Sequence, residues 1–123
     1  MKIKYIEKAK EEAIKSEHQH MIGAVFVKGN RILSKGYNQI RHLKIGKRYT
    51  NFDCSLHAER DCLSKVDKDN IVGGDLYIYR QKRAGGPGLA RPCDQCMWMI
   101  KELGIKRILY STETYPYWEK IKL

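Results

Sequence analysis

The sequence predicts an α/β domain of five strands and three helices whose last two strands pair antiparallel. Three observations predict it: a helical hydrophobic repeat near the N-terminus, several short apolar runs of strand length, and two later helices with recognisable start signals. A chain of 123 residues with 42% hydrophobic content can bury one core. We therefore expect residues 1–123 to form a single domain.

The N-terminal half begins with a helix and continues with a hairpin. Residues 3–17 carry hydrophobic side chains at spacings of three and four, with Lys and Glu between them. The apolar run 22–27 and the segment 32–37 flank a Gly-Asn pair at 29–30, which predicts two strands joined by a tight turn. Residues 38–53 show no clean period, so we expect a long loop there.

Helices and strands alternate in the C-terminal half. Ser55 can cap a helix that runs to about Lys65, and residues 76–79 predict a strand. Pro92 opens a further helix, which should end at Gly104 because a left-handed residue is favoured there.

Two more strands are predicted at 105–110 and 117–121. A parallel crossover needs about a dozen residues, and the connection between these strands is shorter. They should therefore lie antiparallel.

Two short motifs carry the chemistry. They are His57-Ala58-Glu59 and Pro92-Cys93-Asp94-Gln95-Cys96. The two cysteines are three residues apart at a helix start, so both sulfurs point the same way, and the free N–H groups there favour thiolates. A catalytic Zn²⁺ has three protein ligands and one position for water, and His57 can be the third ligand.

Glu59 would then lie near the metal without coordinating it. Zinc lowers the pKa of its bound water towards about 7, and a carboxylate beside that water can carry its proton to a ring nitrogen and a leaving amine. Both motifs in this order are the signature of zinc-dependent nucleobase deaminases. We therefore expect a zinc-dependent hydrolase with one Zn²⁺ per chain and Glu59 as proton shuttle.

From about Ile22 to Tyr110 the chain resembles the cytidine deaminase superfamily. Besides the two motifs, the segments similar to that family are Gly23-Ala24-Val25-Phe26-Val27, Gly36-Tyr37-Asn38 and Gly104-Ile105-Lys106-Arg107. The resemblance implies a three-layer fold with a central mixed five-stranded sheet flanked by helices, and a metal site between two helix N-termini. It also implies that Asn38 and the backbone near Ala58 bind the substrate.

The expected reaction converts cytosine to uracil in a free (deoxy)cytidine nucleoside or nucleotide. The net charge of +10 keeps an alternative open, a cytosine or adenine deaminase of single-stranded DNA or transfer RNA. The link from Gln81 to Arg91 is longer than the family's usual one. By resemblance, members with an antiparallel ending include free-nucleoside and some polynucleotide deaminases. Members with a helix between the last strands include deoxycytidylate and transfer-RNA enzymes.

A second alternative is a closed structural zinc site. Cys54 and His57 together with Cys93 and Cys96 could bind zinc through four ligands and leave no position for water, as in a nucleic-acid-binding module. Glu59 would then have no role. We read Cys62 as a packing residue, since it lies on the buried stripe of its helix.

The remaining expectations concern location and partners. No apolar run approaches the roughly 18 residues of a membrane span, and the N-terminus lacks an export signal. We expect a soluble cytoplasmic protein, without membrane partners, that forms a homo-oligomer. His18 and His20 lack ligand spacing and are expected at the surface.

Overall fold

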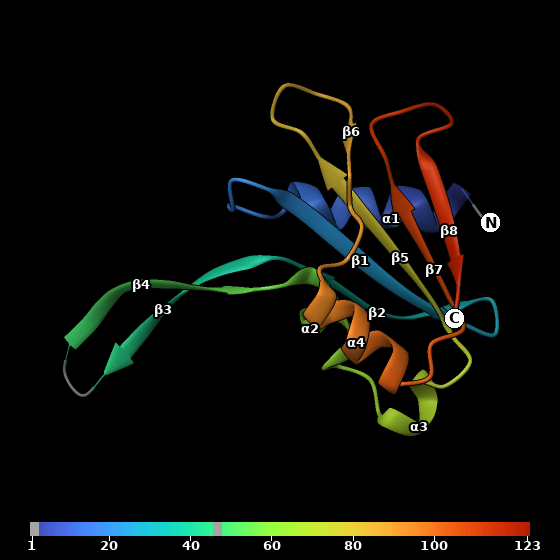
Figure 1. The fold of residues 1–123 in the computed structure, drawn as a ribbon, viewed down its shortest axis with the longest axis horizontal. Helices are drawn as coiled ribbons and strands as arrows, with labels where there is room; N and C mark the ends of the chain where they lie inside the picture. The colour runs from blue at the N-terminus through green and yellow to red at the C-terminus, as the bar shows by residue number, and fades with distance from the viewer. Residues whose placement is uncertain (1–2, 46–47) are drawn as a thin grey trace.

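The computed structural model describes residues 3–45 and 48–123, with side chains described outside 40–55. Its main body has three layers, in which helix α1 (Ile3–Ile14) covers one face of a sheet, and α2 (Ala58–Leu63) and α4 (Asp94–Glu102) cover the other (Figure 1). A single-turn helix, α3 (Lys68–Ile71), follows α2. Every helix among the described residues is too short or too polar to cross a bilayer.

The sheet is mixed, with strand order β2-β1-β5-β7-β8. Its strands are β1 (Met21–Lys28), β2 (Arg31–Tyr37), β5 (Asp75–Gln81), β7 (Arg107–Ser111) and β8 (Trp118–Lys122). Only the β5–β7 pair within this order is parallel, and β8 lies antiparallel to β7. A two-residue strand, β6 (Pro87–Gly88), also pairs antiparallel with the end of β5 but lies outside this linear order. The predicted fold class and the antiparallel ending are therefore confirmed.

Both faces of the sheet are buried, which explains the continuous apolar run in β1. Ala24 and Phe26 pack in the cluster beneath α2 and α4, whereas Val25 and Val27 pack in the cluster beneath α1. Side chains of a strand alternate between the two faces, so a strand covered on both sides needs hydrophobic residues at successive positions.

Two glycines let helices approach this sheet closely. A Cβ at Gly23 would lie 2.2 Å from the carbonyl oxygen of Ala9 in α1. A Cβ at Gly36 would lie 2.5 Å from the backbone nitrogen of Cys62 in α2. Cys62 is fully buried, as predicted for a packing residue. Burial raises the pKa of its thiol to about 12. Its backbone carbonyl oxygen accepts a hydrogen bond from Ser34 Oγ.

The predicted loop over residues 38–53 is wrong. Strands β3 (Gln39–Ile45) and β4 (Arg48–Leu56) pair antiparallel and extend away from the main body (Figure 1). Alternation of hydrophobic and polar residues marks a strand that packs one face on a core, so it is not required of a two-stranded ribbon that extends away from the main sheet.

The predicted helix start at Ser55 is also wrong. Ser55 belongs to β4, where it pairs with Ile40 of β3, and α2 begins only at Ala58. The first helix ends at Ile14 instead of residue 17. The α4 prediction holds more closely, since Gly104 follows the helix with a φ of 80°.

Candidate metal centre and adjoining pocket

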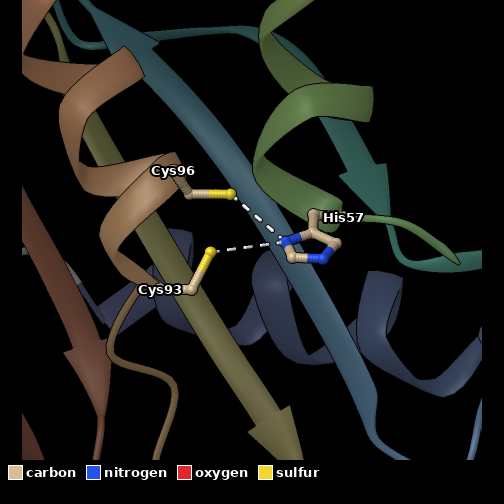
Figure 2. Close-up of side chains that lie close together, drawn as sticks. All are labelled: His57, Cys93 and Cys96. Atoms are coloured by element: carbon tan, nitrogen blue, oxygen red, sulfur yellow. Dashed lines mark hydrogen bonds between the residues drawn. The ribbon is translucent and has the colours of Figure 1, made fainter.

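His57 and the two cysteines meet because the starts of α2 and α4 face each other. His57 is the N-cap residue of α2, Cys93 is the N-cap residue of α4, and Cys96 lies in the first turn of α4. Figure 2 shows the three side chains pointing toward one another from these two helices. His57 Nδ1 lies 3.2 Å from Cys96 Sγ and 3.8 Å from Cys93 Sγ. The predicted trio therefore converges, with Nδ1 as the ring atom facing the sulfurs.

These distances fit a zinc ion. All three potential ligand atoms lie within 4.8 Å of one another. Tetrahedral bonds of about 2.0 Å to nitrogen and about 2.3 Å to sulfur place such ligand atoms roughly 3.5–3.8 Å apart. One nitrogen and two sulfurs are also a donor set that zinc prefers. The group is thus placed for a metal ion with three protein ligands among the described residues.

The two helices begin without side-chain caps. Neither His57 nor Cys93 accepts a capping hydrogen bond from the described residues of its own helix, although each occupies the N-cap position with extended backbone angles. A Ser or Asp at such a position stabilises a helix by about 1 kcal/mol. Both side chains instead turn toward the shared cluster, which is the arrangement expected of a metal site.

The cysteines differ in exposure. Cys96 is fully buried, whereas Cys93 is exposed. Burial, followed by the nearby charge of Glu59, raises the pKa of the Cys96 thiol well above its ordinary value. A bound cation favours the thiolate form that burial disfavours, so this cysteine matches a metal ligand better than a free nucleophile.

Glu59 lies directly beside the cluster. It is in the first turn of α2, it is 5% exposed, and its side chain is hydrogen-bonded to Cys96. Burial raises the pKa of its carboxyl above the ordinary value, which brings it closer to the pH at which a group both takes and returns a proton. Glu59 is not one of the three residues whose ligand atoms converge.

A pocket of about 260 Å³ opens next to the metal cluster. Its lining contains His57, Glu59 and Cys93, together with Ala58 and Asn38. The structure therefore brings all but Cys96 of the predicted site residues to the wall of one cavity.

Asn38 braces that wall. It is 4% exposed, its Oδ1 accepts a hydrogen bond of 2.9 Å from the backbone N–H of Ile22, and its Nδ2 donates to the carbonyl oxygen of His20. The side chain thus joins the end of β2 to the start of β1. Its role in binding substrate stays a prediction.

Other residues also line the pocket, namely His18, His20, Arg80 and Arg91. The sequence placed Arg91, at the end of the basic link, beside the proposed site, but the other three were not recognised as site residues. They come from separate segments that the β1–β5 pairing brings together, since Ile22 pairs with Arg80. No spacing in the sequence could reveal them, although the basic composition of 80–91 was a weak signal. His18 and His20 are at the surface as expected, but at the edge of this pocket.

Asp61 links α2, which carries His57 and Glu59, to the end of β2 and the residue that follows it. It is buried, and its Oδ2 accepts hydrogen bonds from the backbone N–H of Tyr37 at 3.1 Å and from Gln39 Nε2 at 3.2 Å. Asp61 also donates its own backbone N–H to the carbonyl oxygen of His57. It therefore connects α2 to the point where β2 leads into the β3–β4 hairpin. Cys54, the fourth ligand of the closed-site alternative, lies outside the described side chains.

The fold and the His-Cys-Cys cluster define a zinc-dependent hydrolase. The model of the cytidine and deoxycytidylate deaminase zinc-binding region matches residues 1–112, and the chain belongs to this family.

Two relatives and one protein of known structure extend the comparison. The deoxycytidylate deaminase of Mycobacterium phage D29 is 28% identical over 111 residues, covering 76% of this chain and 79% of that protein. That of Schizosaccharomyces pombe is 28% identical over 107 residues, covering 74% of this chain but 30% of that longer protein. The crystal structure of dCMP deaminase from the cyanophage S-TIM5 in apo form has a TM-score of 0.64 at 26% identity, with 94% of this chain and 88% of that chain covered. Its complex with dCMP and dUMP gives a TM-score of 0.63 at 26% identity, with 93% and 85% covered.

Proposed function

We propose that this chain deaminates cytosine to uracil in a free nucleotide, with deoxycytidine monophosphate as the favoured substrate. The observation that carries the proposal is the pocket whose wall joins His57 and Cys93 of the metal cluster to the buried carboxyl of Glu59. The names of the phage and yeast relatives, and the cyanophage enzyme's complex with dCMP and dUMP, support the choice of nucleotide.

In this proposal each site residue has a distinct task. His57 Nδ1, Cys93 Sγ and Cys96 Sγ would hold a zinc ion, and that ion would supply an activated water near C4 of the ring. Glu59 takes a proton from the water and delivers protons to the ring nitrogen and the leaving amine, so that ammonia departs and the water oxygen remains as the carbonyl. The backbone near Ala58 and the side chain of Asn38 position the ring.

One feature points toward another substrate class. The antiparallel β7–β8 ending is the ending that, by resemblance, occurs in free-nucleoside and some polynucleotide deaminases. The named relatives are deoxycytidylate deaminases. We give them more weight because the family match spans residues 1–112, which contain the whole site, whereas β8 comes after it.

The deciding assay compares substrates directly. The zinc-loaded protein is incubated with cytidine, deoxycytidine, their monophosphates, single-stranded DNA and transfer RNA, and both ammonia release and base identity are followed. We expect turnover of deoxycytidine monophosphate above the others. Reaction with the polymers alone, weakening steeply from low to physiological salt, would replace this proposal with polynucleotide deamination.

The single-domain organisation, the homo-oligomer and the cytoplasmic location stay predictions.

A further inference from the structure

The lining of the pocket contains two chemically different groups of residues. The first, which we call the metal end, is His57 and Cys93 of the metal cluster with Glu59, which is the one carboxylate among the described lining residues. The second, which we call the cationic end, contains Arg80, whose Nη2 lies 2.8 Å from Nδ1 of His20. The pocket therefore combines a site suited to moving protons with a fixed positive charge.

Arg80 lacks an anionic partner within the part of the chain whose side chains the structure describes. Among the described residues no ion pair joins its guanidinium to a carboxylate, and its Nε is buried without a hydrogen-bond partner. A buried, unpaired donor on a charged group is costly, so such a group is normally satisfied by a ligand, a water or a counter-ion. By contrast Arg107, at the opposite end of the sheet, makes two hydrogen bonds of 3.0 Å to Asp75.

The side chain of Arg80 is held in place by its neighbours. Arg80 pairs with Gly88 of β6, and a Cβ at Gly88 would lie 3.0 Å from Cδ and 3.1 Å from Cγ of Arg80. Ser111 ties the two strands together, because its Oγ accepts from the backbone N–H of Arg80 at 3.0 Å and donates to the carbonyl oxygen of Gly88 at 2.7 Å. A side chain at position 88 would therefore press against the methylene chain of Arg80, which would have to shift by a few tenths of an ångström. A guanidinium fixed in this way loses little freedom on binding.

We propose that Arg80 binds the phosphate of the substrate and that Gly88 positions it, so that the pocket selects a nucleoside monophosphate over the free nucleoside. The proposal deepens the proposed function and rests on it for the reaction. A planar guanidinium matches two phosphate oxygens, and a phosphate would supply the anionic partner that Arg80 lacks among the described residues. The segment that carries both residues, from the end of β5 through β6, overlaps the Gln81–Arg91 link, which is longer than the usual one in the family by resemblance.

The first test measures kcat/KM for deoxycytidine monophosphate and for deoxycytidine with the zinc-loaded chain, Arg80→Gln and Arg31→Gln. Loss of a charge-assisted contact should lower the value for the monophosphate about 10- to 100-fold in Arg80→Gln, with a much smaller fall for deoxycytidine. Arg31 is an exposed arginine of β2 that does not line the pocket, and its variant should keep the ratio of the two substrates. Equal falls for both substrates in Arg80→Gln, or no fall, would overturn the proposal.

Two further variants test the positioning. Gly88→Ala keeps the charge but places a methyl group 3.0 Å from Cδ of Arg80, so the side chain must shift and the same substrate preference should fall with zinc content unchanged. Arg80→Lys restores the charge without the planar donors and should recover part of the preference. A Gly88→Ala chain with the full preference would show that Gly88 has no positioning role.

Binding measurements separate this proposal from the proposed function. Isothermal titration calorimetry with deoxycytidine monophosphate, deoxycytidine and inorganic phosphate is repeated on the chain and on Arg80→Gln. Tighter binding of the monophosphate that depends on Arg80, without any deamination, would keep the phosphate site and overturn the deaminase assignment. Deamination by a chain whose affinity for the monophosphate is the same with and without Arg80 would keep the deaminase assignment and overturn the phosphate site.

Discussion

The metal end and the cationic end of the same pocket are built in opposite ways. The metal end comes from two motifs of a few residues each, placed at the starts of α2 and α4. The cationic end comes from His20, Arg80 and Gly88, which meet through strand pairing. Metal ligands and a proton-transferring carboxylate need precise positions, and here they lie at the starts of packed helices. The residues proposed to bind a charged group lie instead at strand ends and in a link.

The difference also concerns how each end is supported. α2 lies so close to β2 that Gly36 has no room for a side chain, and Asp61 fastens it to Tyr37 and Gln39. Arg80 relies on a two-residue strand and on one serine, Ser111. Substitutions should therefore affect the two ends separately, and the following predictions test that separation.

The largest effect should come from removing a zinc ligand. His57→Ala, Cys93→Ala and Cys96→Ala should each lose most of the bound zinc and all measurable deamination, because three protein ligands leave no spare one. Metal analysis of the purified chain should give one zinc per chain before substitution and far less afterwards. Phosphate binding through Arg80 should weaken less than zinc binding does.

Cys54→Ala is the matched control for these variants. It should keep both zinc and turnover if the site has three protein ligands and an open position. Zinc loss equal to that of Cys93→Ala would instead support the closed structural site with four ligands.

A smaller effect is expected from Glu59, which should act on protons and not on the metal. Glu59→Gln should keep zinc and the fold but lower kcat by about 10²- to 10⁴-fold, the usual contribution of a general acid–base group. Glu102→Gln, an exposed glutamate of α4, serves as control and should leave kcat unchanged. Near-normal turnover in Glu59→Gln would remove this residue from the mechanism.

The smallest effect should come from Gly36→Ala, which touches neither ligand nor substrate. Its methyl group would lie 2.5 Å from the backbone nitrogen of Cys62, so α2 must shift. Overpacking of this kind costs about 1–3 kcal/mol of unfolding free energy, which urea denaturation can measure. Zinc affinity should fall because His57 moves with α2, whereas the preference for monophosphate over nucleoside should not change.

Lys35→Ala, at the neighbouring exposed position of β2, provides the comparison because it adds no atoms beneath α2. If Gly36→Ala has the same unfolding free energy and the same zinc affinity as the original chain, the close approach at Gly36 does not hold α2 in place. A fall in substrate preference equal to that of Arg80→Gln would show that the two ends are coupled.

Local patterns were enough to predict the features that local physics decides. The turn at 29–30, the end of α4 at Gly104 and the antiparallel β7–β8 pair each depend on a few neighbouring residues, and the structure has all three. The convergence of His57 with Cys93 and Cys96 followed from the motif spacing together with the family resemblance.

Features decided by pairing across the chain were missed. Ser55 is a favourable N-cap residue, but its backbone belongs to the ladder of β4 with β3, and this pairing outweighs the local preference. The basic composition of 80–91 did not reveal the position of Arg80, because its place beside His20 depends on the register between β1 and β5. A single sequence does not reveal that register.

The antiparallel ending has a consequence for association between copies of the chain. It makes β8 an outer strand of the main sheet among the described strands, as β2 is at the other edge, where Asp61 and Lys65 already bond the backbone of Tyr37 and Lys35. Such edges can add a further strand from another molecule and so start aggregation. Exposed charged side chains interrupt both strands, namely Arg31 and Lys35 in β2 and Glu119, Lys120 and Lys122 in β8. A strand that docked against either edge would have to desolvate these charges, so the basic composition of the chain also protects its sheet from edge-to-edge growth.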